Sequence, residues 1–107
     1  MNLISPTEAV KMLEAGTAYG VDVREKNEWD AGHIAGVELN SLSEFSLEKL
    51  KTDKPIIFIC RSGNRSGQVC DTLWPTGINI LNLEGGMKAW HAAGLPMVAE
   101  SGNPQVA

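Results

Sequence analysis

One of the two cysteines, Cys60, stands where a nucleophile would be expected. It follows an apolar run, 56–59, and precedes a short polar segment, 61–66, that contains two arginines, two serines and a glycine. A thiol becomes a good nucleophile when nearby positive charge and hydrogen-bond donors lower its pKa below the free value of about 8.5. The spacing therefore indicates a reactive thiolate at Cys60 rather than a cysteine buried only for packing.

The segment that follows Cys60 has the composition of an anion-binding loop. Its two arginines carry permanent positive charge, and its glycine permits conformations in which successive backbone amides point at one centre. Its serines add hydroxyl donors to the same centre. We therefore predict Cys60 as the catalytic residue, and we predict that the substrate is bound by Arg61, Ser62, Gly63, Asn64, Arg65 and Ser66.

The elements that must position this loop are a strand and a helix. The continuous, β-rich run 55–60 is typical of a strand that is buried on both faces of a parallel sheet. The segment 66–74 has apolar residues at helical spacing until Pro75 prevents its continuation. Ligands gather at the carboxyl ends of parallel strands, and a helix N-terminus favours negative charge. Both features coincide at Cys60.

The rest of the chain continues the alternation of strands and helices. Ser5-Pro6-Thr7-Glu8 is a capping box that predicts a helix to about Ala15. Further predicted elements are a strand at 19–23, a helical turn within 24–30, a short strand after 33–37, a weak helix at 46–51, a strand at 78–83 and a helix at 87–93. This order predicts an α/β domain with a mainly parallel central sheet flanked by helices. We expect the domain to span 1–100 and the residues 101–107 to form a flexible tail.

Several stretches resemble the rhodanese family, in the family's order and over nearly the whole chain. They are Asp22-Val23-Arg24-Glu25 with Glu28-Trp29, Gly32 to Gly36, the loop from Cys60 to Ser66, and Gly85 to Trp90 with Gly94-Leu95-Pro96. The resemblance implies a three-layer rhodanese-like fold and an enzyme of the thiosulfate sulfurtransferase type. Cys60 would take sulfane sulfur from a donor such as thiosulfate, hold it as a persulfide and pass it to cyanide, a thiol or a protein.

The implied chemistry needs no cofactor and no metal, because sulfite is a stable anionic leaving group that requires no general acid. Two alternatives remain open. A rhodanese-like regulatory or interaction module would keep the fold without turnover, although the presence of Cys60 and both arginines weighs against it. A phosphatase or arsenate reductase loop would place arginine six positions after the cysteine, where this sequence has Ser66.

Residues outside the loop are assigned supporting roles. In the family interpretation, Asp22, Arg24 and Glu28 brace the loops through ion pairs and hydrogen bonds. Cys70 lies on the apolar side of the helix after the loop, and we expect it to be a core residue rather than a second reactive thiol. His33 is expected to be a hydrogen-bonded structural histidine rather than an acid or base.

Composition limits the partners and the setting. The chain has 107 residues, 13 acidic against 9 basic, and a net charge of −4, which argues against nucleic acid as a partner. The longest apolar run, 56–60, is far shorter than the roughly 20 residues of a membrane helix. The first residues do not read as a signal peptide, so we expect a cytoplasmic location and reduced thiols. The expected partners are a small anionic sulfur donor and a thiol or protein acceptor.

Overall fold

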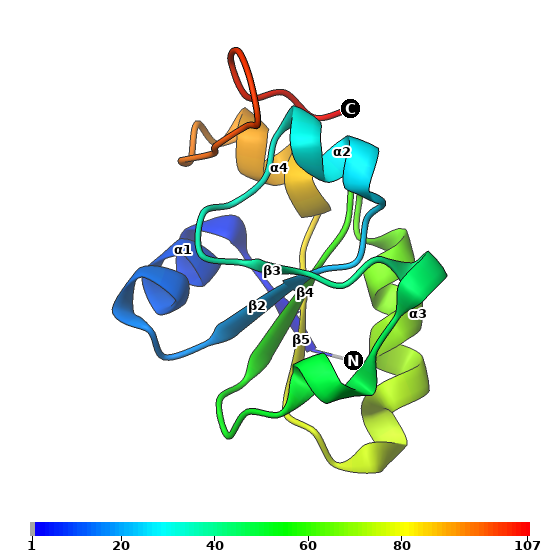
Figure 1. The fold of residues 1–107 in the computed structure, drawn as a ribbon. Helices are drawn as coiled ribbons and strands as arrows, with labels where there is room; N and C mark the ends of the chain where they lie inside the picture. Colours follow the sequence, from blue (N-terminus) through cyan, green and yellow to red (C-terminus); the bar gives the residue numbers. More distant parts are fainter. Residues whose placement is uncertain (1) are drawn as a thin grey trace.

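The computed structural model describes residues 2–107 and has a five-stranded sheet at its centre (Figure 1). The strands are β1 (Asn2–Ile4), β2 (Tyr19–Asp22), β3 (Glu38–Leu39), β4 (Ile56–Ile59) and β5 (Ile80–Leu83). Their order across the sheet is β1-β5-β4-β2-β3, and each neighbouring pair is parallel. The predicted α/β class with a mainly parallel central sheet is therefore confirmed.

Four α-helices accompany the sheet: α1 (Pro6–Ala15), α2 (Lys26–Ala31), α3 (Asn64–Leu73) and α4 (Gly86–Ala92). Single 3₁₀ turns occupy Leu42–Glu44, Leu47–Leu50 and Trp74–Thr76. The weak helix predicted at 46–51 is thus only a 3₁₀ turn. The strand β1 was not predicted, because three residues are too few to show a period. Helix α3 begins two residues earlier than predicted, directly after the loop glycine.

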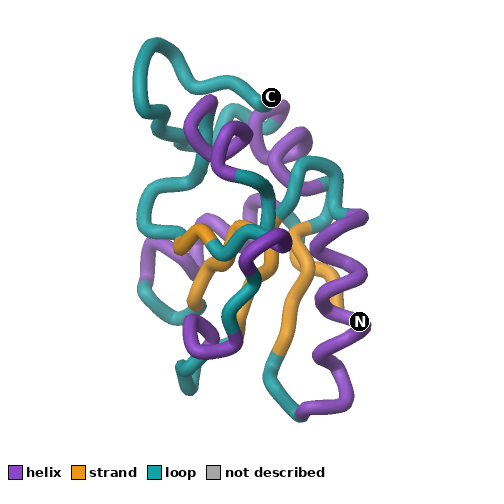
Figure 2. Tube along the Cα trace, turned by 45° about the vertical axis from the view of Figure 1, so that its right-hand side comes forward, coloured by secondary structure: helices purple, strands orange, loops and turns teal. Residues whose placement is uncertain are grey.

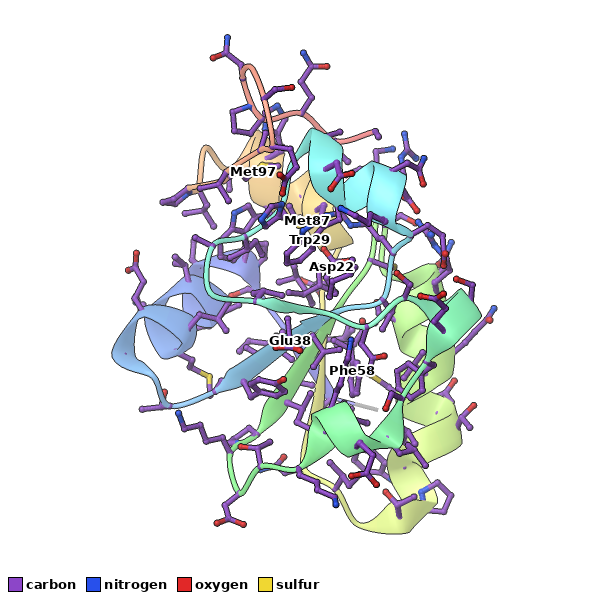
Figure 3. All side chains as sticks on the ribbon, in the orientation of Figure 1. Asp22, Trp29, Glu38, Phe58, Met87 and Met97 are labelled. Carbon is purple, nitrogen blue, oxygen red and sulfur yellow. The ribbon has the colours of Figure 1, made fainter. Side chains whose placement is uncertain are left out.

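The sheet is the middle of three layers, with helices α1 and α4 on one face and helix α3 on the other, and an apolar core fills the space on each side. On one face, Ile57 and Ile59 of β4 pack with Ala9 of α1 and with Met87 and Trp90 of α4. The opposite face of β4 packs with Val69, Cys70 and Leu73 of α3. Figure 2 shows the strands enclosed between the helices, and in Figure 3 Phe58 lies on the side of α3. All four residues of β4 are 0% exposed, which explains why this strand is continuously apolar.

Helices α2 and α4 lie close together near the carboxyl ends of the central strands (Figure 1). Figure 3 places the labelled side chains of Trp29 and Met87 beside one another in this region, and both belong to the same apolar core. The loop after β4 emerges at this end of the sheet. Loops at the carboxyl edge are the usual place for ligand binding in open α/β sheets.

The last residues return to the same end of the molecule. The amide of Gln105 donates to the carbonyl of Ala31 at 2.9 Å. Val106 packs against the apolar core to which α1 and α4 contribute. The flexibility of 101–107 in solution stays a prediction. Among the described residues, no helix is both long enough and apolar enough to cross a membrane.

Candidate active site

The sulfur of Cys60 lies at the carboxyl end of β4 and at the start of α3. The residue is 1% exposed. Its Sγ accepts a hydrogen bond from the amide of Gly63 at 3.0 Å and another from the hydroxyl of Ser66 at 3.2 Å. Both donors belong to the first residues of α3 or to its N-cap, so the unpaired end of the helix is directed at the sulfur.

Gly63 gives the loop its curvature. Its backbone φ of 100° lies in the left-handed region, which residues other than glycine rarely adopt. This conformation turns the chain so that the Gly63 amide points back at the sulfur three residues earlier, while the Gly63 carbonyl accepts from the amide of Gly67 at 3.0 Å. Glycine is therefore needed here for its backbone conformation and not for space, because a Cβ atom would come no closer than 3.6 Å to its nearest neighbour.

The pKa of Cys60 is lowered from that of an ordinary cysteine. Burial is the largest single influence and raises the pKa, but several donors together outweigh it. They are the hydroxyl of Ser66 and the amides of Ser66, Gly63 and Ser62, each of which favours the thiolate. The largest lowering influences are thus hydrogen bonds of the loop itself. The arrangement can hold a sulfur anion at Cys60.

The start of α4 supports the loop from beneath. The amide of Met87 donates to the carbonyl of Cys60 at 2.8 Å, and the amide of Lys88 donates to the carbonyl of Arg61 at 3.0 Å. A Cβ atom at Gly86 would overlap the Cys60 carbonyl and lie 2.7 Å from the Arg61 carbonyl. Gly86 therefore permits the close contact that fixes the backbone at Cys60 and Arg61.

The two loop arginines have different surroundings. Arg65 forms a bidentate ion pair with Glu28 of α2, with both nitrogen–oxygen distances at 2.7 Å. Its side chain is 36% exposed, and that of Glu28 is 15% exposed. Arg61 is exposed, and its Nε donates to the main-chain oxygen of Ala107 at 3.0 Å. Arg61 is thus the more accessible of the two loop arginines.

Glu28 joins α2 to the loop. Its pKa is lowered from the ordinary value of 4.5, chiefly by the hydrogen bonds from Arg65. Burial raises the pKa but is outweighed, because the amide of Glu25 and the charges of Arg65 and Arg24 also lower it. The carboxylate therefore serves both the capping box of α2 and the ion pair with the loop. Glu28 braces the loop, as the family resemblance implied.

A buried ion pair anchors α2 to the sheet. Asp22 at the end of β2 binds the guanidinium of Arg24 through two oxygens, with a shortest distance of 2.7 Å. Arg24 also donates to the carbonyls of Gly32 at 2.8 Å and Glu28 at 3.4 Å. Asp22 and Arg24 are 1% and 0% exposed. Their role is to hold α2 over the carboxyl edge, and neither bonds to Cys60.

The residue that sequence reasoning missed is Asn82 of β5. It is 3% exposed, and its Oδ1 lies 2.5 Å from the hydroxyl of Ser66. Its Nδ2 donates to the carbonyl of Gly63 at 3.1 Å. The available signal was a polar side chain within the otherwise apolar strand Ile80–Leu83, because buried polar groups need partners.

The remaining predicted loop residues, Ser62 and Asn64, are exposed at the mouth of the loop. Outside it, Cys70 lies in the core and burial raises its pKa to about 12, so it is a packing residue as predicted. His33 stacks on Trp29 with ring centroids 3.7 Å apart, and its Nδ1 lies 2.8 Å from the Trp29 carbonyl. This confirms the structural role predicted for His33.

Comparison with known proteins is consistent with this geometry. The family profile of the rhodanese-like domain matches residues 5–93. The uncharacterized protein YqhL of Bacillus subtilis is 42% identical over 73 residues, which are 65% of this chain and 58% of YqhL. Thiosulfate sulfurtransferase GlpE of Pseudoalteromonas translucida is 33% identical over 94 residues, which cover 84% of this chain and 89% of GlpE. The chain thus spans little more than half of YqhL but most of GlpE.

The fold has close counterparts among solved structures. The crystal structure of a rhodanese-related protein from Thermoplasma volcanium superposes with a TM-score of 0.83 at 31% identity. The match covers 92% of this chain and 98% of that protein. The agreement therefore extends over most of both chains.

Proposed function

This chain belongs to the rhodanese family, and on that premise we propose that it transfers sulfane sulfur through a persulfide on Cys60. Family membership and the relatives named as sulfurtransferases support sulfur transfer in general. The donor we propose is thiosulfate or a related small anion. The acceptor is a thiophile such as cyanide, a thiol or a protein.

The observation that carries the proposal is the hydrogen bonding of the Cys60 sulfur. Its Sγ accepts from the Gly63 amide and the Ser66 hydroxyl at the N-terminus of α3. These donors favour the thiolate that must attack, and the same loop of amides can hold the negative outer sulfur of a persulfide. The named relative GlpE is described as a thiosulfate sulfurtransferase, which supports thiosulfate as the donor.

The proposed reaction has two displacements. The Cys60 thiolate attacks the outer sulfur of thiosulfate, a new sulfur–sulfur bond forms, and sulfite leaves with the electron pair of the bond that breaks. A nucleophilic acceptor then attacks the outer sulfur of the persulfide, and the electron pair of that sulfur–sulfur bond returns to Cys60. Neither displacement needs a proton from the protein when the attacking groups are anions. Cyanide as acceptor would yield thiocyanate.

The substrate-binding set of the proposal is the loop from Arg61 to Ser66. Its amides and the Ser66 hydroxyl surround the sulfur, and Arg61 supplies accessible positive charge for an anionic donor. Arg65 is paired with Glu28, so its larger contribution is to fix the loop. A cytoplasmic, reducing setting fits this role, because Cys60 and Cys70 are both free thiols.

The test is an intact-mass measurement of the reduced protein after brief incubation with thiosulfate. We expect wild type to gain the mass of one sulfur and to lose it on addition of cyanide, with thiocyanate formed. Cys60→Ser should gain nothing. Cys70→Ala is the matched control, because it removes the other thiol from the core, and it should load normally.

Three results would count against the proposal. Loading of Cys60→Ser would show that another group carries the sulfur. If wild type gains no sulfur from thiosulfate, from mercaptopyruvate or from a low-molecular-weight persulfide, the chain is a rhodanese-like module without turnover. Hydrolysis of a phosphoester by wild type but not by Cys60→Ser would instead favour a cysteine phosphatase.

A further inference from the structure

The hydroxyl of Ser66 lies between two acceptors. Its oxygen is 3.2 Å from the Sγ of Cys60 and 2.5 Å from the Oδ1 of Asn82. A serine hydroxyl has a single proton to donate. It can therefore satisfy the sulfur or the amide oxygen, but not both at once.

The orientation of the Asn82 amide is fixed by its other contact. Its Nδ2 donates to the carbonyl of Gly63, which also accepts from the amide of Gly67. Reversing the amide would set two oxygens against each other at Gly63. The Oδ1 must therefore face Ser66. Ser66 is 0% exposed and Asn82 3%, so the competition takes place away from bulk solvent.

The protonation state of Cys60 decides which acceptor receives the proton. When Cys60 is a thiol, its S–H donates to the Ser66 oxygen, and the Ser66 hydroxyl donates to Asn82. When Cys60 is a thiolate, the hydroxyl must turn to the sulfur, and the Asn82 oxygen loses its donor. When Cys60 carries a persulfide, the charge lies on the outer sulfur and the inner Sγ is only a weak acceptor, so the hydroxyl returns to Asn82.

We propose that Asn82 is a positioning residue that, through the Ser66 hydroxyl, disfavours the free thiolate of Cys60 relative to its thiol and persulfide forms. The part concerning the persulfide rests on the proposed function. In that setting Asn82 favours the sulfur-loaded enzyme, because loading releases the hydroxyl that the thiolate had taken. Asn82 thus shifts the equilibrium between the unloaded and the sulfur-loaded Cys60 without contacting the sulfur donor or the sulfur acceptor.

Other charged groups near the loop do not compete for this proton. The charged ones are Asp22 at the end of β2 with its partner Arg24, Glu28 of α2, Arg61 of the loop and Arg65 of α3, and the other titratable thiol is that of Cys70 in α3. Arg65 and Cys70 interact with Cys60 through charge, and the thiol of Cys70 has a pKa of about 12. Absorbance of thiolate at 240 nm between pH 5 and 10 therefore reports on Cys60, with Cys60→Ser as the blank.

The first experiment titrates the reduced protein without any sulfur donor. We expect Asn82→Ala, and Asn82→Leu as a variant that fills the space, to lower the apparent pKa of Cys60 by about 0.5 to 1 unit. Ser66→Ala should raise it, and adding Asn82→Ala to Ser66→Ala should change it no further. If Asn82 only held the Gly63 carbonyl in place, its loss would raise the pKa in both backgrounds, and that result would overturn the proposal.

The second experiment uses wild type and does not depend on how the Asn82 variants fold. The side-chain amide of Asn82 is followed by NMR while Cys60 is titrated. We expect its shifts to change with the same midpoint as the thiolate absorbance, and we expect Ser66→Ala to reduce the change strongly. An Asn82 amide that does not respond to the ionisation of Cys60 contradicts the proposal.

The third experiment tests the loaded form. At a fixed ratio of thiosulfate to sulfite, above the pKa of Cys60, Asn82→Ala should reduce the ratio of loaded to unloaded protein about three- to tenfold. An unchanged or increased ratio refutes this part. If wild type itself does not load, the proposed function fails for thiosulfate, whereas the two titrations still decide the role of Asn82.

Discussion

At the residue scale, the loop divides its two arginines between different tasks. Arg65 is held by the side-chain carboxylate of Glu28, whereas Arg61 is exposed and bonds to the main-chain oxygen of Ala107. An ion-paired guanidinium presents little net charge to an incoming anion, because the charge of its partner cancels most of the field. The attraction of an anionic donor to this loop should therefore depend mainly on Arg61.

We predict that Arg61→Ala weakens donor binding more than it slows the displacement. The thiosulfate concentration for half-maximal loading should rise about three- to tenfold, with little change in the loading rate at saturation. The measurement is the rate of sulfur loading as a function of thiosulfate concentration. Lys54→Ala removes the same charge from an exposed position outside the loop and is the matched control. Equal effects of the two substitutions would contradict this assignment.

At the element scale, α2 and α3 are joined across the site by Glu28 and Arg65. The folded state lowers the pKa of Glu28 below 4.5, chiefly through the hydrogen bonds from Arg65. A carboxylate with a depressed pKa stabilises the fold above its unfolded pKa, and this contribution is lost as the pH falls through its folded pKa. The ion pair should therefore matter at neutral pH and not in acid.

We predict that Glu28→Gln lowers the urea midpoint of unfolding at pH 7 and that the difference from wild type disappears as the pH falls below 4.5. The measurement is urea unfolding followed by circular dichroism at several pH values. Glu48→Gln, which removes a carboxylate from the exposed pair with Lys51, is the control and should leave the midpoint unchanged at both ends of the range. A difference for Glu28→Gln that persists in acid would mean that packing, not charge, is responsible.

The junction between the Cys60 loop and α4 also belongs to this scale. Gly86 and Gly94 both have positive φ, but a Cβ at Gly86 would overlap the Cys60 carbonyl, whereas at Gly94 it would meet nothing within 4 Å. We predict that Gly86→Ala destabilises the protein by about 1–3 kcal/mol more than Gly94→Ala does and also reduces sulfur loading. Thermal unfolding and the mass assay check both effects. Similar losses in the two variants would show that backbone conformation alone matters.

At the scale of the whole molecule, the sequence predicts features built from consecutive residues and misses contacts between residues that are distant in the chain and that the fold brings together. The position of Cys60 was predictable because strand, loop and helix are consecutive. The contact of Asn82 with Ser66 depends on the pairing of β5 with β4, which places Phe58 beside Asn82. The ion pair of Glu28 with Arg65 joins residues 37 apart, so only the family resemblance indicated a bracing role.

The C-terminal residues give a prediction at the same scale. We keep the expectation that 101–107 is more flexible than the domain, because no strand or helix includes it. Hydrogen exchange should therefore be fast for the amides of 101–103. The amide of Gln105 should exchange more slowly, because it donates to the Ala31 carbonyl. Protection of the whole segment at the level of β4 would show that the tail is part of the rigid domain.

The stability of the entire fold should depend strongly on the buried pair of Asp22 and Arg24. Asp22→Asn leaves the guanidinium of Arg24 buried without its counter-charge, and breaking a buried pair in this way costs about 3–5 kcal/mol. The free energy of unfolding, measured by urea denaturation at pH 7, should fall by that amount. Lys26→Ala breaks an exposed pair with Asp30 on α2 and should leave the unfolding midpoint unchanged. A small effect of Asp22→Asn would mean that the backbone carbonyls of Glu28 and Gly32 suffice to hold Arg24, so that α2 stays over the site without the charge of Asp22.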